Sequence, residues 1–537
     1  MRDEVYGVTA GVWLAASLLA VCAGILLLEA ILGTPYPHFL YATAAILVID
    51  LYFIIRYGLF SVPTIATGLL TYPALVPFLT TVVLGARHYT PYALQFESVR
   101  LASKIVWLVA ILLVIFAAVL RLLEARGRRQ RTGEEPSIID RLTPGWLPRL
   151  LGYEMPTDRT AFVILSGVLV LSAYLHAPGP TILSATYEGS ANYQPGWATW
   201  AGSTFKAAFA LLFLTVLQSK VTDRRFLAFL GVVGATVVWL LLHGRRVESV
   251  GIVLLLFVDV VKNRAELSNL ELVSTARGLS VSAAFSAYLG TIVLVGRLRN
   301  IIGTVELGLV RSPASQEPSG GSAGSSSGGS SSGESSSGGA DTVRPGDSVD
   351  VVGSVASSLQ YGNGRVGLPG GAHGIYGTMR ATVHVFDEGK PLLNGRTFLN
   401  YVPQSIPTPI LVVVGYTPPQ SYTDLLASTY AHNGGNYFMN VYYANFGSLG
   451  LLLAGAVLAV LVHVTQKSLE QGRPRPTVAT AVAAVLFINL ARALWYTQLN
   501  WIDTLQGLVI VGLLVVATSR LGYRLSSVLP TSQAPRR

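Results

Sequence analysis

Charged residues and cysteines are both scarce in this chain. Of its 537 residues only 12% are Asp, Glu, Lys or Arg, whereas 51% are hydrophobic. An average soluble domain carries about 25% charged residues. The composition therefore excludes an ordinary soluble enzyme and predicts a polytopic membrane protein. The single cysteine, Cys22, allows no disulfide bond within the chain.

A concentrated basic surface is missing as well. The formal net charge is +10, but the Lys and Arg residues lie mostly in short segments between apolar runs. Basic residues in such segments set the orientation of membrane spans. The charge therefore indicates membrane lipid, and no nucleic acid, as the partner of these residues.

Long apolar runs recur along the whole chain. A helix needs about 20 predominantly apolar residues to cross the hydrocarbon core, and by this criterion we expect an all-α fold with about twelve spans. Three prolines are expected to kink or break the third span, and the eighth is expected to begin before its apolar run. The expected spans are 8–32, 39–57, 59–84, 105–123, 161–176, 203–217, 226–242, 250–261, 279–295, 447–464, 478–496 and 505–520.

The loops between these runs predict an orientation in the plasma membrane. The Arg-rich connection after the fourth span is expected to be cytoplasmic, and alternation from there puts both termini inside. The loop at 177–202 and the stretch HGRRVES at 243–249 are then external. The predicted organisation is nine spans in 1–296, a large external segment at 297–446, and three spans in 447–537.

The large external segment has two parts. Residues 312–340 are almost all Ser and Gly, a composition with too little apolar surface to offset the entropy of ordering, so we expect a disordered tether there. Residues 341–446 mix short apolar stretches, glycines and isolated cations. We expect this second part to fold as a cap on the outer ends of the helices.

Two adjacent arginines stand between apolar runs in HGRRVES. Arg245 and Arg246 are expected at the outer leaflet, where two interpretations apply. They either snorkel to lipid phosphates and mark a helix end, or bind a substrate anion, because a guanidinium group matches phosphate oxygens bidentately and keeps its proton. Glu248 is a candidate to orient one of these arginines or to act in the chemistry.

A second motif lies in AHNGGNYFMNVYYANFGSLGLLLAG at 431–455. A His-Asn pair precedes a short helical stretch, and a residue pair then precedes F-G-x-x-G at the start of a span. The pattern resembles the signature of Wzy-type polymerases, which join lipid-linked oligosaccharide repeat units, and of the related O-antigen ligases. Upstream, GTMRATVHVFDEGKPLLNGRTFLNYVPQSIP is similar to that family too, so the resemblance covers 226–455. The motif residues are His432, Asn433, Tyr443, Ala444, Asn445, Phe446, Gly447 and Gly450.

The resemblance implies a GT-C-like membrane glycosyltransferase that builds surface polysaccharide on the outer face of the membrane. In this reaction a hydroxyl of one lipid-linked unit attacks the anomeric carbon of another, and a polyprenyl diphosphate leaves. Fixed cations stabilise the charge that develops on the leaving group. Arg245 and Arg246 are the first candidates for this role, and Arg380 and Arg396 of the cap are candidates for a second clamp.

The same reaction needs a group that accepts the proton of the attacking hydroxyl, and histidine suits this task. His432 is the candidate because it lies in the motif; the alternative is a loop histidine beside a helix capped by Asn433. His373 in GGAHG is the competitor. Tyr443 belongs to an aromatic run that either lines a sugar site or lies at the membrane interface.

Paired carboxylates at the spacing of metal ligands are absent from the segments expected outside, so we expect transfer without metal or cofactor. The expected substrate is a polyprenyl-diphosphate-linked oligosaccharide, and the resemblance implies a chain-length regulator and a flippase as further partners. The alternatives are an O-antigen-type ligase, a flippase or exporter of the same lipid, and a structural scaffold. A flippase is expected to have repeated halves, which the sequence does not show. Asp50 and Arg492, inside expected spans, are further functional candidates.

Overall fold

The computed structural model is helical throughout the residues that it describes. These are 39–76, 99–131, 146–177, 196–243, 245–267, 269–291, 370–387, 389–404, 415, 437–496 and 498–528. Within these ranges no strand forms, and one isolated bridge joins Glu154 to Thr477. The protein is an all-α membrane protein in these parts, because six of the described helices are long and apolar enough to cross a bilayer.

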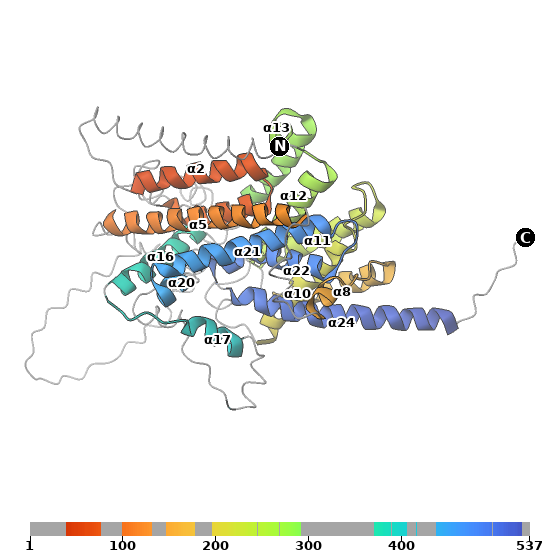
Figure 1. The fold of residues 1–537 in the computed structure, drawn as a ribbon. Coiled ribbons are helices and arrows are strands. Elements are labelled where there is room, and N and C mark those ends of the chain that lie inside the picture. Colours follow the sequence, from red (N-terminus) through yellow and green to blue (C-terminus); the bar gives the residue numbers. More distant parts are fainter. Residues whose placement is uncertain are drawn as a thin grey trace, which may run out of the picture.

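The helices follow the apolar runs of the sequence, and the longest of them lie roughly parallel (Figure 1). Their bounds are α2 Phe39–Tyr57, α3 Val62–Ala74, α5 Val99–Arg131, α7 Trp146–Leu151, α8 Arg159–His176, α10 Gly196–Leu214, α11 Arg224–Leu242, α12 Arg246–Val258, the π-helix η3 Asp259–Arg264, α13 Asn269–Ser274, α16 Gly370–Asp387, α17 Arg396–Gln404, α20 Phe438–Phe446, α21 Leu449–Gln471, α22 Val478–Ile488, α23 Leu490–Trp495 and α24 Leu499–Val528. Residues 276–291 are helical as well.

The six candidate spans coincide with the second, fourth, fifth, seventh, tenth and twelfth expected spans. The eighth begins at Arg246, ahead of its apolar run, which confirms that expectation. The third is described only as α3, which contains Pro73 and ends at Ala74. The first expected span and the Ser/Gly segment lie outside the described residues. The total of twelve spans therefore stays a prediction.

The eleventh expected span is not one continuous helix. It is divided at Asn489 into α22 and α23. The Asn489 side chain donates to the carbonyl of Val485 at 2.9 Å, which is the kind of local bond by which asparagine competes with helix continuation. Hydropathy alone does not reveal this break, because the apolar run continues through it.

Polar contacts show which helix ends lie together. At one end Arg56 of α2 lies 3.5 Å from Glu124 of α5. These two residues line a cavity together with the last turns of α21. Gln218, after α10, bonds to the carbonyl of Pro474 between α21 and α22 at 2.7 Å. We name this the Glu124 end. The opposite end, where α8, α12 and α23 meet at Glu248, is the Glu248 end.

A fully paired buried charge lies at the Glu124 end, and we name it the Arg264 lock. Asp259 and Arg264 of η3 each have a side chain only 2% exposed, and their Oδ2 and Nε atoms are 2.5 Å apart. Asn263 donates to the other carboxylate oxygen of Asp259 at 3.0 Å. The guanidinium also donates to the carbonyls of Val216 and Ser219, so the lock fixes η3 to the end of α10.

Part of the expected cap is described and packs on the helices. Helix α16 contacts α3, α5 and α20, and Ile375, Tyr376 and Met379 on it are buried. It lies with α20 at the same end of the long helices (Figure 1). At the end of α16, Asp387 forms an ion pair with Lys104 of α5 at 2.5 Å. Residues 341–369 of the expected cap lie outside the described residues.

Candidate functional site

Five charged side chains and one histidine converge at the Glu248 end. Three of these side chains are less than a tenth exposed, in a region whose helices are otherwise apolar. Charge in such a place is costly and marks a functional candidate. We name this group the Glu248 cluster. Its members are His176 of α8, Lys206 of α10, Arg245 directly before α12, Glu248 of α12, Arg492 of α23 and Asp503 of α24.

Glu248 is the centre of the cluster. It is 5% exposed, and its Oε1 atom forms an ion pair with Nη1 of Arg492. Nε2 of His176 lies 3.7 Å from the same oxygen. Glu248 also stands in the first turn of α12, where unpaired N–H groups favour a negative charge. A carboxylate this far from water needs such partners, so it holds Arg492 in a fixed position.

The ring of His176 is held in place by residues of α10. It is the last residue of α8, and its ring stacks on Phe205 of α10 with centroids 5.4 Å apart. The ring also lies over Gly202, where an added Cβ atom would be 2.5 Å from Cε1 of the histidine. The ring is therefore covered by protein. This placement suits a residue that positions Glu248, rather than one that meets an acceptor sugar.

The cluster members other than Glu248 and His176 carry more positive than negative charge. Lys206 is 6% exposed and lies within electrostatic range of Asp503, Arg492 and Arg245. Among the described residues, three basic side chains thus lie near two carboxylates, which leaves one formal positive charge when Lys206 is protonated and His176 is neutral. An excess of one sign between low-dielectric walls attracts a counter-ion. The arrangement is suited to an anion.

The depth and exposure of the cluster also matter. His176 ends its candidate span and Asp503 stands two residues into another, so these two members lie within about one turn of helix ends, whereas Lys206 lies deeper along α10. The Arg492 side chain is 30% exposed, and Arg245 is half-buried. These two side chains therefore remain partly reachable from outside the helices.

The residues of the HGRRVES stretch divide between the cluster and its edge. Arg245 and Glu248 are both members, and Glu248 forms an ion pair with Arg492, an arginine almost 250 positions away in sequence. The backbone N–H of Arg245 donates to the carbonyl of Leu240 at 2.8 Å, which closes the turn between α11 and α12. Arg246 is the first residue of α12, and its side chain lies outside the described parts.

The cap cations and histidines are placed only in part. Arg380 is half-buried on α16, and Arg396 is exposed at the start of α17. Within the described ranges no hydrogen bond or ion pair joins either arginine to the Glu248 cluster. His373 stands in the first turn of α16, with its side chain outside the described parts. His432 and Asn433 lie outside the described residues altogether.

Tyr443 is bound into a network at the junction of α5, α16 and α20. Its hydroxyl donates to Oδ1 of Asp387 at 2.9 Å, and the Asp387 carboxylate also accepts from Lys104. Burial and the neighbouring Asp387 raise the pKa of Tyr443, so its hydroxyl keeps the proton that it donates. In this structure Tyr443 joins helices, and any contact with substrate stays a prediction.

The F-G-x-x-G element has a structural role in this chain. Gly447 has a φ of +59°, which L side chains rarely adopt. A Cβ atom on Gly450 would lie 2.1 Å from the carbonyl oxygen of Tyr442. These two glycines let α20 turn sharply into α21. Asn445, just before them, donates to Oγ1 of Thr397 at 2.9 Å and so ties α17 to this turn.

The aromatic residues of α20 face the protein interior. Phe438, Met439 and Tyr442 are 6% exposed or less, and the hydroxyl of Tyr437, just before the helix, donates to the carbonyl of Leu70 at 2.7 Å. The described part of the run NYFMNVYY is therefore packed against neighbouring helices. It does not present a row of rings to a sugar.

Three cluster members were not selected from the sequence. Lys206 interrupts the apolar run of α10, and its burial shows that it turns inward. His176 and Asp503 look like helix-end residues in the sequence, and only the packing brings them to the cluster. The available signal was a charge inside an apolar run, the same signal that selected Arg492.

Within the described ranges no three His, Cys, Asp or Glu side chains gather at a spacing that could hold a metal ion. Transfer without a metal stays a prediction that needs a direct experiment. In comparisons with known proteins, no family model matches the chain, and neither a curated protein nor a solved structure gives a significant match.

Proposed function

We propose that this protein is a membrane glycosyltransferase that polymerises oligosaccharide repeat units carried on a lipid diphosphate. The observation that carries the proposal is the Glu248 cluster, with its excess of cations at the ends of apolar helices. The resemblance of 226–455 to Wzy-type polymerases and O-antigen ligases supports the same substrate class.

The chemistry of the substrate fits the position of the cluster. The diphosphate of a polyprenyl carrier lies at headgroup depth, while its chain lies in the hydrocarbon core and its glycan outside. Guanidinium groups bind phosphate oxygens bidentately and stay protonated. Arg492 and Arg245, both partly exposed, are the proposed contacts to the diphosphate. Fixed in place, they stabilise the charge that grows as the glycosidic bond breaks.

The remaining residues have supporting roles in this proposal. Glu248 and His176 are positioning residues that fix Arg492. Lys206 adds positive charge from deeper along α10. The acceptor hydroxyl loses its proton to His432, with His373 as the competitor. Arg246, Arg380, Arg396, Asn433 and Tyr443 remain candidates for contacts with the substrate.

The proposal also includes an orientation. The Glu248 end faces the outside of the plasma membrane, together with the cap, and the twelve spans place both termini in the cytoplasm. Several basic residues at the Glu124 end support this choice, among them Arg126 at the end of α5 and Arg475 after α21, because basic loops favour the cytoplasmic side.

Reconstitution in liposomes tests the proposal. The substrate is a lipid-diphosphate oligosaccharide extracted from the source organism, with EDTA present, and products are separated by length on a gel. Wild type is expected to give a ladder. Arg492→Gln, Arg245→Gln and His432→Ala are expected to slow it about 100-fold or more, the usual loss when one transition-state contact is removed. Arg475→Gln, an exposed cation at the other end, is the matched control.

Each other outcome has a definite reading. Transfer of one glycan to a different acceptor, without a ladder, would indicate a ligase. No transfer by folded wild type, but movement of the lipid between leaflets, would indicate a flippase. A ladder that survives Arg492→Gln and Arg245→Gln would leave the function in place and contradict the Glu248 cluster as its site. Loss of the ladder in EDTA alone would contradict transfer without a metal.

A further inference from the structure

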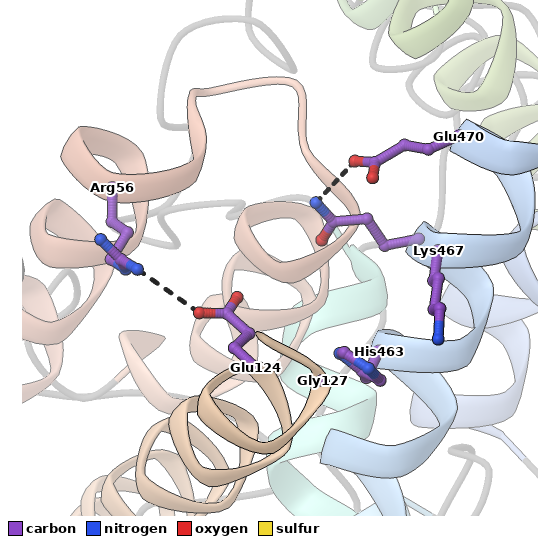
Figure 2. A pocket seen from close by; sticks show the side chains of 7 residues that line it. Arg56, Glu124, Gly127, His463, Lys467 and Glu470 are labelled. Carbon is purple, nitrogen blue, oxygen red and sulfur yellow. Dashed lines mark hydrogen bonds and ion pairs between the residues drawn. The ribbon is translucent and has the colours of Figure 1, made fainter. Parts of the chain in front are cut away.

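A polar cavity of about 300 Å³ opens at the Glu124 end, between the last turns of α2, α5 and α21. Figure 2 shows Arg56 and Glu124 on one side of it, and His463, Lys467 and Glu470 of α21 on the other. None of these residues belongs to the Glu248 cluster, which lies at the opposite end of the helices. The cavity therefore needs an explanation of its own.

The cavity lies at the depth of lipid headgroups. Arg56 is the next-to-last residue of one candidate span, Gly127 ends a second, and Glu470 is the next-to-last residue of a third. The hydrocarbon core ends near such positions, and phosphate and ammonium groups of lipids begin there. A ligand with its acyl chains in the bilayer can reach the cavity without being pulled out of the membrane.

Cations in the cavity offer a place for a phosphate group. Arg56 lies 3.5 Å from Glu124 and its guanidinium is 5.7 Å from the centre of the Tyr57 ring, while its buried Nε atom has no hydrogen-bond partner among the described residues. Lys467, also on the lining, makes no hydrogen bond or ion pair with a described residue. These two groups, with the ring of His463 on the same lining, provide donors for phosphate oxygens.

The cavity has as many carboxylates, Glu124 and Glu470, as it has Lys and Arg residues. This balance argues against a ligand that carries only negative charge. Glu470 accepts a hydrogen bond from Gln466 through Oε1 at 2.9 Å, and its Oε2 atom makes no bond with a described residue. A primary ammonium group can donate to that oxygen, whereas a second phosphate would be repelled by it. Opposite charges in one cavity match a ligand that carries both charges.

The wall of the cavity formed by α5 contains a glycine, so no side chain fills the space at that position. Gly127 lines the cavity, and a Cβ atom added there would meet nothing within 4 Å. The missing side chain enlarges the cavity between α5 and α21. It also provides a test, because a larger residue at 127 fills the cavity without disturbing the packing of the helix.

We propose that this cavity binds a phosphoethanolamine group, with the phosphate at Arg56 and Lys467 and the primary ammonium at Glu470. The group can come from the headgroup of a phosphatidylethanolamine lipid or from a soluble phosphoethanolamine. Either source brings one phosphate and one N–H donor to the same charged lining. The proposal does not depend on the glycosyltransferase function.

Thermal unfolding of the purified full chain in dodecyl maltoside tests this proposal. Dioleoyl phosphatidylethanolamine, phosphatidylcholine and phosphatidylglycerol are added in turn, and soluble O-phosphoethanolamine in a separate arm. A ligand that binds the folded state raises the melting temperature. We expect the largest rise with phosphatidylethanolamine, because choline has no N–H to donate and the glycerol headgroup has no cation. A rise with O-phosphoethanolamine as well would identify a soluble source, and a rise with the lipid alone would identify the membrane.

Variants locate the effect. Glu470→Gln and Lys467→Gln each remove one charged partner, and we expect affinity to fall about tenfold. Gly127→Leu should abolish the rise, whereas Gly167→Leu should keep it, because Gly167 on α8 also has open space around it but lies away from the cavity. Equal rises with phosphatidylglycerol and phosphatidylethanolamine, or no rise with either source, would overturn the proposal. A full rise in Gly127→Leu would overturn the site. If Gly127→Leu fails to fold, the exposed Glu470→Gln decides.

Discussion

The Arg264 lock and the Glu248 cluster are both buried groups of charge, at opposite ends of the same helices. In the lock one arginine meets one carboxylate, and every charged atom has a partner: Asp259 accepts from Asn263 and Arg264, and the guanidinium reaches two carbonyls and lies 3.9 Å above the ring of Phe226. In the cluster three cations share two carboxylates. Among the described residues, the lock is neutral and fully hydrogen-bonded, whereas the cluster has one formal positive charge in excess.

The difference separates a structural role from a binding role. A buried pair with complete hydrogen bonding is held rigidly and has nothing to offer a ligand, so the lock joins η3 to α10 and does no more. A group with an excess of one sign is incompletely neutralised in the free protein, and an anion would complete it. Burial of charge alone therefore does not identify a site; the balance of partners does.

The largest effect is expected from breaking the lock. Arg264→Met leaves the Asp259 carboxylate, 2% exposed, without a cation, and loss of one partner of such a pair costs about 3–5 kcal/mol of unfolding free energy. Thermal unfolding in detergent measures the loss. Asp259→Leu combined with Arg264→Met should recover most of it, since neither charge is then left unpaired. A single variant as stable as wild type would contradict the structural role.

A substitution in the Glu248 cluster should reduce stability less than one in the Arg264 lock, but it should weaken anion binding more. Arg492→Met removes the ion-pair partner of Glu248, but His176, Lys206 and Arg245 remain near, so we expect a loss of about 1–3 kcal/mol. Inorganic pyrophosphate provides a direct probe of the excess charge. It should raise the melting temperature of wild type and of Arg264→Met, and not that of Arg492→Met. An equal rise in all three proteins would show that pyrophosphate binds elsewhere.

The sequence predicts some of these features and not others. Hydropathy is a local property, so the bounds of six spans follow from it, whereas the break at Asn489 depends on a side chain that competes with the helix inside an apolar run. Arg245, Glu248 and Arg492 could be selected from the sequence because they are charges inside or directly beside apolar runs. The pairing of Glu248 with Arg492 could not be predicted, because α12 and α23 are brought together only by tertiary packing.

The roles of the motif residues show the same limit. F-G-x-x-G and its neighbours could be read from the sequence as a functional signature. In the structure Gly447, Gly450 and Asn445 shape the junction of α17, α20 and α21. A motif can thus reflect the geometry of a turn, and residue type alone does not distinguish a turn from a site.

A smaller change should separate position from charge within the cluster. Gly202→Ala adds a methyl group 2.5 Å from the His176 ring and leaves every charge in place. The ring must shift away from residue 202, which changes its position relative to Glu248, at a cost near the lower limit of overpacking, about 1 kcal/mol. Pyrophosphate should then bind more weakly than to wild type but better than to Arg492→Met. Unchanged binding would show that His176 does not position the cluster.

The smallest effect is expected where charge is neither buried nor in excess. Arg475 and Glu154 lie 3.9 Å apart at the Glu124 end, with side chains 81% and 67% exposed. Water and salt screen such a pair, so Arg475→Gln should change the unfolding free energy by no more than about 0.5 kcal/mol. Pyrophosphate should stabilise this variant as it does wild type, because the excess of cations at the Glu248 end is intact. A loss of pyrophosphate binding here would mean that overall charge, rather than the arrangement around Glu248, attracts the anion.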